Sequence, residues 1–291
     1  MDPLVRQGLI LGIVGVVTGV AYAIDAWWWS PSRRRTRARK WAERHVTASD
    51  DTWLIPFEQQ GVINRRVAAV GTFLALVVLV EIPMSGQPYA AWLMSIPPLF
   101  AIAFGLSGTR MALPRGTRVA RLRELELADY LPEAMRWFMW VAGAVGCLAC
   151  LLVAVVRSEW LLGISGLLML VAPASVELAA RRLARMPEPA QGAAHLYLQD
   201  VLRADHIAAA ALMSALSAAF LCNWLSMAID DPDWAVWTLL GINFVLLTGF
   251  YLFALKLGKP STYMRSRLWP QLRPGQLLSG ADPMSTVGVA S

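Results

Sequence analysis

Long apolar runs recur along almost the whole chain, and shorter polar segments separate them. A helix needs about 20 apolar residues to cross a hydrocarbon core about 30 Å thick. The runs near that length are Gly8–Trp29, Val67–Met84, Tyr89–Gly105, Trp137–Val156, Trp160–Ala180, Ile207–Ile229 and Trp234–Leu257. The pattern predicts an all-α, polytopic membrane helix bundle of about seven transmembrane helices, with residues 1–260 forming a single transmembrane domain.

Two segments depart from this regular pattern. The third run is short and has Pro97 and Pro98 at its centre. Because proline removes a backbone donor and clashes with the preceding turn, a kinked or re-entrant segment is expected there. Residues 261–291 are rich in proline, serine and glycine and lack an apolar period, which predicts a largely disordered cytoplasmic tail.

The composition agrees with insertion into a membrane. Hydrophobic residues make up 57% of the chain and charged residues 16%, whereas soluble domains carry roughly 25% charged residues. A net charge of +6 would also suit a nucleic-acid-binding protein. The basic residues concentrate between the apolar runs, however, so the expected partner is the lipid bilayer and not nucleic acid.

The distribution of basic residues predicts the orientation. All 26 lysine and arginine residues except Arg6 and Arg157 fall on one side of the predicted membrane. Since basic connections stay in the cytoplasm, we expect a multi-pass protein of the cell membrane with its N-terminus outside and its C-terminus inside. The alternative is a signal peptide cleaved after Ala23, but cleavage would leave the arginine block after Trp29 outside.

The connection before the fourth run contains an amphipathic pattern. Val119, Leu122 and Leu125 recur every third residue, and Arg118 and Arg121 fall largely on other faces of the turn. This pattern predicts an interfacial helix near residues 117–131 along the inner leaflet. Two interpretations stay open. The helix docks a cytoplasmic or membrane partner subunit, or it rests on lipid with its arginines at anionic headgroups.

Small residues share faces on several predicted helices, where they allow backbones to approach closely. The helix-packing face of the first run consists of Gly8, Gly12, Gly15 and Gly19. Cys147, Cys150 and Cys222 stand in similar stripes on the fourth and sixth runs. Although Cys147 and Cys150 form a CxxC pattern, their neighbours are apolar, so we interpret all three cysteines as packing residues and not as a metal or redox site.

Ionisable side chains inside the predicted spans are few. Asp25, Glu81 and Glu177 all lie toward helix ends, which argues against a proton or cation relay. Glu177 stands four residues before Arg181, a spacing that predicts an ion pair on one helix face.

Asn223 and Asn243 form the best candidate for an intramembrane polar pair, because they lie at similar depth on the sixth and seventh runs. They are expected either to join the two helices by a hydrogen bond or to line a path.

No motif assigns catalytic, cofactor-binding or metal-binding residues. His195 and His206 flank Asp200 and Asp205, but their spacing matches no compact metal site such as H-E-x-x-H. That motif, G-x-S-x-G and a phosphate-binding loop are all absent from the sequence.

One linker carries a family resemblance. Met186-Pro187-Glu188-Pro189 leads into a helix of mixed charge, Tyr197–His206, that runs straight into an alanine-rich span. The Met186–His206 segment resembles uncharacterised polytopic membrane proteins of actinobacteria, which are often assumed to work beside ABC-type transporters. We therefore expect a non-catalytic transporter component or accessory subunit. The alternatives are a self-contained small transporter or channel and, third, a membrane-embedded enzyme.

Overall fold

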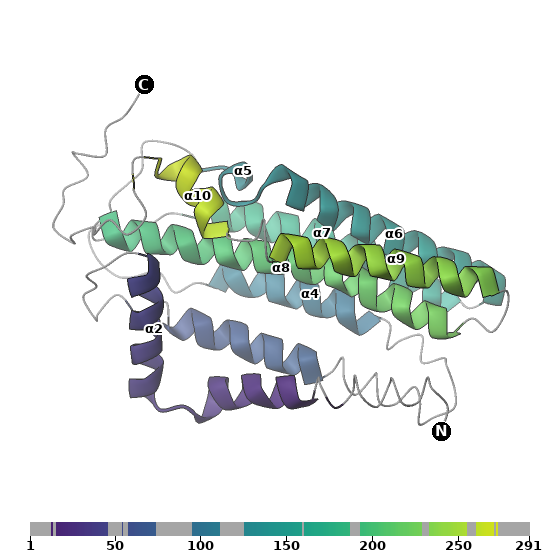
Figure 1. The fold of residues 1–291 in the computed structure, drawn as a ribbon, viewed down its shortest axis with the longest axis horizontal. Helices are drawn as coiled ribbons and strands as arrows, with labels where there is room; N and C mark the ends of the chain where they lie inside the picture. The colour runs from purple at the N-terminus through teal and green to yellow at the C-terminus, as the bar shows by residue number, and fades with distance from the viewer. Residues whose placement is uncertain are drawn as a thin grey trace.

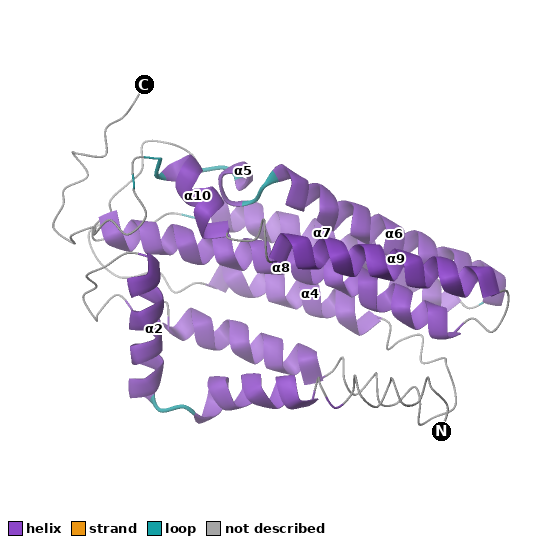
Figure 2. Ribbon diagram, in the orientation of Figure 1, coloured by secondary structure: helices purple, strands orange, loops and turns teal. Residues whose placement is uncertain are grey.

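The computed structural model describes residues 13, 16–45, 54, 58–73, 95–110, 125–158, 160–186, 193–228, 233–254, 260–270 and 272. These residues form helices and no β-strand, as Figure 2 shows. Residues 16–23 and 58–73 are helical. The remaining elements are the π-helix η1 (Ile24–Trp28), α2 (Pro31–His45), α4 (Ile96–Ser107), the 3-10 helix η3 (Gly108–Arg110), α5 (Leu127–Tyr130), α6 (Glu133–Arg157), α7 (Trp160–Ala184), α8 (Ala193–Ala228), α9 (Asp233–Leu252) and α10 (Pro260–Leu268).

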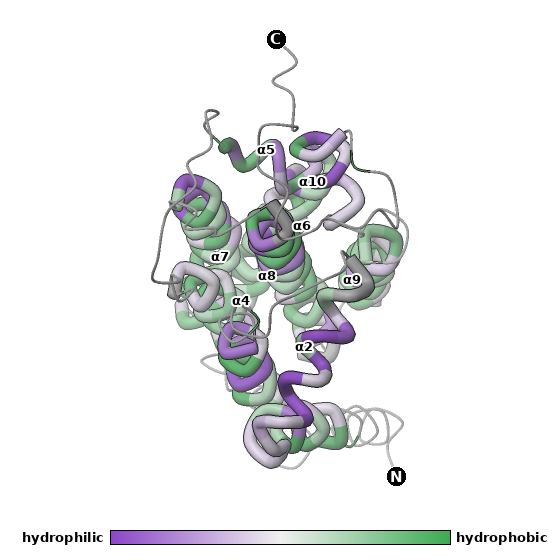
Figure 3. The backbone as a smooth tube through the Cα atoms, turned by 90° about the vertical axis from the view of Figure 1, so that its left-hand side faces the viewer, coloured by the Kyte–Doolittle hydropathy of each residue, from purple (hydrophilic) through white to green (hydrophobic). Residues whose placement is uncertain are grey.

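The long helices lie side by side and alternate in direction, so the bundle has two different ends (Figure 1). At one end α2, α5 and α10 gather with the first turns of α6 and α8 and the last turns of α7. We call this the basic end, because α2 and the last turns of α7 and α10 all carry arginine. Figure 3 views the bundle from the basic end, where the largely hydrophilic α2 lies across the direction of the long helices.

Four described helices are long and apolar enough to cross a membrane. They are Glu133–Val156 in α6, Trp160–Ala184 in α7, His195–Ser226 in α8 and Trp234–Leu252 in α9. These segments overlap the last four predicted spans, so the prediction of apolar helices of membrane-spanning length is confirmed for this part of the chain. The shorter α4 is also apolar. Parts of the first three predicted spans lie outside the described residues.

Helix α8 is the centre of the bundle. It contacts α4, α6, α7 and α9 along its length and α10 at the basic end. Its 36 residues make a rod about 54 Å long at 1.5 Å per residue. The predicted span began at Ile207, whereas α8 begins about four turns earlier at Ala193. Those extra turns carry the charged residues Asp200, Arg203 and Asp205 and extend α8 at the basic end beyond its alanine-rich part.

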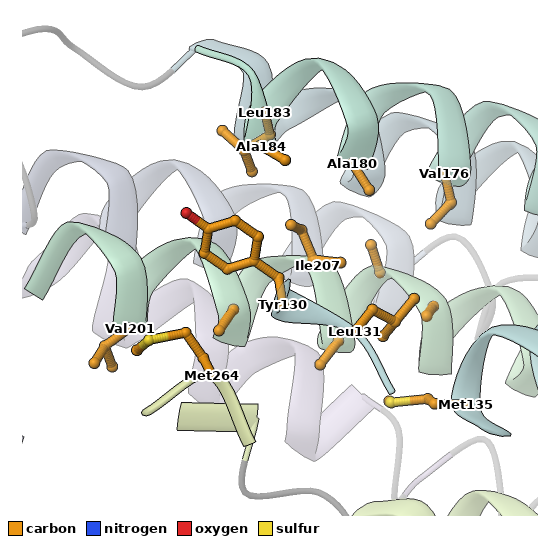
Figure 4. Packing of buried hydrophobic residues seen from close by; sticks show 14 of the residues in the cluster. Tyr130, Leu131, Met135, Val176, Ala180, Leu183, Ala184, Val201, Ile207 and Met264 are labelled. Atoms are coloured by element: carbon orange, nitrogen blue, oxygen red, sulfur yellow. The ribbon is translucent and has the colours of Figure 1, made fainter. Parts of the chain in front are cut away.

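Buried side chains form two main clusters along the bundle. Figure 4 shows the first, at the basic end, where Tyr130 of α5 and Met264 of α10 pack against Leu183, Val201 and Ile207. The second lies where α6, α7, α8 and α9 meet, and it contains all three cysteines. The hydrophobic core therefore includes short helices outside the predicted spans.

Helices α6 and α7 approach each other closely at Gly143. A Cβ on Gly143 would lie 2.7 Å from the carbonyl oxygen of Met169 and 3.0 Å from Cγ of Pro173. Pro173 lies inside α7 and has no N–H to donate to Met169, the residue four positions earlier. The carbonyl freed by the proline therefore lies against the glycine of the neighbouring helix.

The two prolines of the third predicted span lie at the start of a described helix. Pro97 and Pro98 lie in the first turn of α4, which follows Ser95. Proline is tolerated there because a first-turn N–H has no partner within the helix. The carbonyl oxygen of Pro97 accepts a hydrogen bond from Ser217 Oγ of α8 at 2.9 Å, which joins the first turn of α4 to α8. The kinked or re-entrant form expected for this span stays a prediction, because residues 89–94 lie outside the described residues.

The predicted interfacial helix is also corrected. Glu126 has an extended backbone and caps the short α5, in a reciprocal pair of hydrogen bonds with Asp129. One helix therefore cannot run from residue 117 to residue 131. Leu125 packs against the first core cluster, and Tyr130 is fully buried. Val119, Leu122, Arg118 and Arg121 lie outside the described residues.

The segment predicted as a tail begins with packed structure. Helix α10 occupies Pro260–Leu268, and Met264 and Trp269 are buried in the first core cluster. The predicted domain boundary at residue 260 is therefore too early. The small polar residues of this segment suggest a tail in the sequence, although Met264 and Trp269 anchor the helix. Residues 273–291 lie outside the described residues.

Candidate interaction site at the basic end

Asp200 of α8 fastens two short helices to the basic end. Its side chain is fully buried, and it accepts hydrogen bonds from the Tyr130 hydroxyl at 2.8 Å and from Trp269 Nε1 at 2.7 Å. Tyr197, about one turn earlier, packs edge-on against Trp269 with 5.4 Å between ring centroids. Because Tyr130 belongs to α5 and Trp269 follows α10, one carboxylate holds both helices on the projecting part of α8.

A second carboxylate joins α6 to α7. Glu177 forms the predicted ion pair with Arg181. It also accepts hydrogen bonds from Arg136 and from Trp140 Nε1 of α6, each at 2.6 Å. Sequence reasoning missed both of these donors, although their spacing of four residues places them on one face of α6. The group is structural, because all its members are engaged with one another.

A third polar group lies among α4, α8 and the helix at 58–73. His206 Nδ1 lies 3.2 Å from Asn64 Nδ2, and His206 Nε2 lies 3.3 Å from the carbonyl oxygen of Gly105. The amide therefore donates to Nδ1, and Nε2 carries the proton. The ring stacks on Phe104 with 5.0 Å between centroids. A Cβ on Gly108 would overlap this ring, so only glycine fits there.

The two histidines serve different neighbours. His195 Nε2 lies 3.1 Å from Gln199 Nε2, whereas His206 belongs to the group around Asn64. Among the described residues, no three His, Cys, Asp or Glu side chains are placed to hold a metal ion.

The structure brings the predicted intramembrane pair together. Asn243 Nδ2 donates to Asn223 Oδ1 at 3.4 Å, across the interface between α8 and α9. Trp237, Phe244 and Tyr251, also on α9, are all exposed. The amides therefore join a peripheral helix to the central one.

The small-residue faces lie in helix contacts where they are described. Cys147, Cys150 and Cys222 are buried and unoxidised. A Cβ on Gly166 of α7 would lie 2.9 Å from Cβ of Cys150, which is the close contact that a small-residue face allows. Gly19 faces Thr72 within this chain, and a Cβ on Gly19 would lie 3.5 Å from the Thr72 Cγ2. Gly8, Gly12 and Gly15 lie outside the described residues.

Helix α2 has one packed face and one exposed face. Arg34, Ala38, Trp41 and Ala42 are wholly or partly buried, and their spacing places them on one side of the helix. Ala42 packs with Leu198 of α8, and Arg34 donates to the carbonyl oxygen of Ala26 at 3.0 Å. The exposed side carries five cations, Arg33, Arg35, Arg37, Arg39 and Lys40.

Asp25 connects α2 to the neighbouring helices. It forms ion pairs with Arg37 and with Arg65 of the helix at 58–73. Burial, and then repulsion from Arg65, lowers the pKa of Arg37. The Arg37 guanidinium also lies over the Trp29 ring, 3.3 Å from its centroid. These contacts fix the first half of α2 against the end of the bundle.

No protein-family model, curated protein or solved structure gives a significant match to this chain. Among the described residues, the buried carboxylates Asp200 and Glu177 join neighbouring helices, and the arginines of α2 and of the last turns of α7 and α10 lie at the basic end.

Proposed function

We propose that the protein is a non-catalytic subunit of a membrane assembly, either a transporter component or an accessory to one. In this proposal it is a multi-pass protein of the cell membrane with seven spans, an external N-terminus and its basic end in the cytoplasm. The alternation of the described helices and the collection of arginines at one end support this orientation.

The observation that carries the proposal is the pair of hydrogen bonds that Asp200 accepts from Tyr130 of α5 and from Trp269, which follows α10. It holds together an ordered group at the basic end, formed by α5, the first four turns of α8 and α10, which we call the platform. Tyr263 of α10 also donates to the carbonyl oxygen of Ala128 of α5 at 2.8 Å. The platform replaces the single interfacial helix that the sequence predicted as the docking element, and its proposed partner is a cytoplasmic or membrane subunit.

The alternative of a self-contained transporter or channel receives less support. Its predicted path depended on Asn223 and Asn243, which hydrogen-bond to each other beside the peripheral α9. If the alternative holds, replacing both asparagines with leucine abolishes flux in reconstituted vesicles. Unchanged flux would show that the two asparagines do not line a transport path.

Purification in a gentle detergent tests the proposed subunit role. We expect one protein to co-purify at constant stoichiometry and to be lost when the exposed Thr262 and Arg267 of α10 are both changed to glutamate. The matched control neutralises Arg33, Arg35 and Lys40 of α2 and should keep the partner. Reproducible purification of the chain alone, or retention of the partner by the α10 variant, would overturn the proposal.

The orientation has its own test. Reporter fusions after Arg44, Asp231 and Arg273 should read inside, outside and inside. A cytoplasmic reading at Asp231 would reverse or remove the proposed topology.

A further inference from the structure

In the proposed topology, on which this inference rests, α2 follows the first span at a level marked by tryptophans. Trp27 and Trp28 lie at the end of η1 and have 49% and 84% of their surface exposed. Tryptophan rings favour the headgroup region, because they are apolar with one polar N–H. Trp29 then adopts an extended backbone, which ends η1 two residues before α2 begins. Helix α2 therefore begins at headgroup depth.

The direction of α2 keeps it at that depth. It crosses the direction of the long helices and does not run along them (Figures 1 and 3). Trp41 and Ala42 hold its far end against Leu198 of α8, as Arg34 and Arg37 hold its near end. A helix fixed at both ends across the bundle lies in the plane of the membrane surface.

The exposed side of α2 matches the chemistry of that surface. Its five cations are Arg33, Arg35, Arg37, Arg39 and Lys40. Asp25 pairs with Arg37 and with Arg65. Arg33, Arg35 and Lys40 are exposed along the same helix. Clusters of four to eight Lys and Arg residues directly cytoplasmic of a transmembrane helix are typical of binding to anionic headgroups.

We infer that α2 is a binding site for anionic phospholipids of the leaflet at the basic end. Its arginine side chains contact headgroup phosphates, and the tryptophans before it set the depth. Guanidinium groups suit this role because they present several donors to phosphate oxygens. The inference is independent of the platform, which lies on other elements.

Lipid titration of the full-length protein, followed by native mass spectrometry, tests the inference. The probes are phosphatidylglycerol and phosphatidylcholine, and the variant is the triple change Arg33→Gln, Arg35→Gln and Lys40→Gln. These three side chains are exposed, and the variant leaves Arg34 and Arg37 to hold the helix. We expect the apparent affinity for phosphatidylglycerol to fall at least about tenfold, and that for phosphatidylcholine to stay unchanged.

Two matched variants separate a specific site from net charge and from misfolding. Arg182→Gln, Arg185→Gln and Arg267→Gln remove three exposed charges elsewhere at the basic end and should leave the wild-type preference. Arg33→Lys with Arg35→Lys keeps the charge and should retain most of it. The inference is overturned if the α2 variant binds phosphatidylglycerol like wild type, or if the control variant loses as much affinity. It is equally overturned if neutralising α2 releases an acidic protein partner while the lipid preference persists.

Discussion

Helices α8 and α9 are almost equally apolar but occupy opposite positions in the bundle. Their most apolar segments are about equally hydrophobic, yet 67% of that segment is buried in α8 and 11% in α9. The difference lies in side-chain size. The buried stripe of α8 includes Ala211, Ala215 and Ala218, whereas α9 exposes Trp237 and Phe244. In lipid, burial of apolar surface brings no hydrophobic gain in free energy. The helix whose small side chains allow the closest packing therefore occupies the centre of the bundle.

The substitution expected to have the largest effect on stability removes the buried carboxylate on α8. Changing Asp200 to alanine should destabilise the protein by about 3 kcal/mol, because two buried donors lose their acceptor. Tyr130→Phe removes one of the two hydrogen bonds and should cost about 1 kcal/mol. Thermal unfolding in detergent, together with proteolysis at α10, measures both effects. If Asp200→Ala unfolds like wild type, α8 does not hold the platform as described.

A matched pair of leucine substitutions tests side-chain size directly. Ala218 of α8 is fully buried, and a Cβ on Gly146 would lie 3.1 Å from the Ala218 Cβ. Ala218→Leu should therefore cost about 2 kcal/mol through overpacking. A Cβ added to Gly241 of α9 would have no neighbour within 4 Å, so Gly241→Leu should leave the unfolding temperature unchanged or slightly raised. Equal losses of stability for Ala218→Leu and Gly241→Leu would contradict the difference in packing between α8 and α9.

The smallest effect is expected at the contact between the two helices. Asn243→Ala should cost about 0.6 kcal/mol, which is typical of an interhelical hydrogen bond in a membrane protein. A double-mutant cycle with Asn223→Ala, measured by unfolding in detergent, isolates this bond from packing effects. A coupling several times larger would mean that α9 is held as firmly as the buried helices.

The apolar pattern was sufficient to predict the last four spans, because each is a long run bounded by charge. It was insufficient for the start of α8. There the residues around Asp200 are polar in sequence, and they become buried only when α5 and α10 cover them. The ion pair of Glu177 with Arg181 was predictable because it is local, whereas its partners on α6 depend on how two helices pack.

The prediction of one interfacial helix near residues 117–131 was wrong for a local reason. A three-residue period was extended through Glu126, where the sequence also allows a capping box with Asp129, and the cap ends the pattern. Hydrogen bonds from Tyr130 and Trp269 to Asp200 join residues about 70 positions apart. No local pattern contains that information.

Helix α8 also has a mechanical consequence. Its 36 residues contain neither glycine nor proline, so the usual causes of a kink are absent from the rod. At about 54 Å it is longer than the hydrocarbon core is thick, and a tilt of about 5° at one end displaces the other by about 5 Å. If α8 tilts as a rigid body, the platform at its end moves with it.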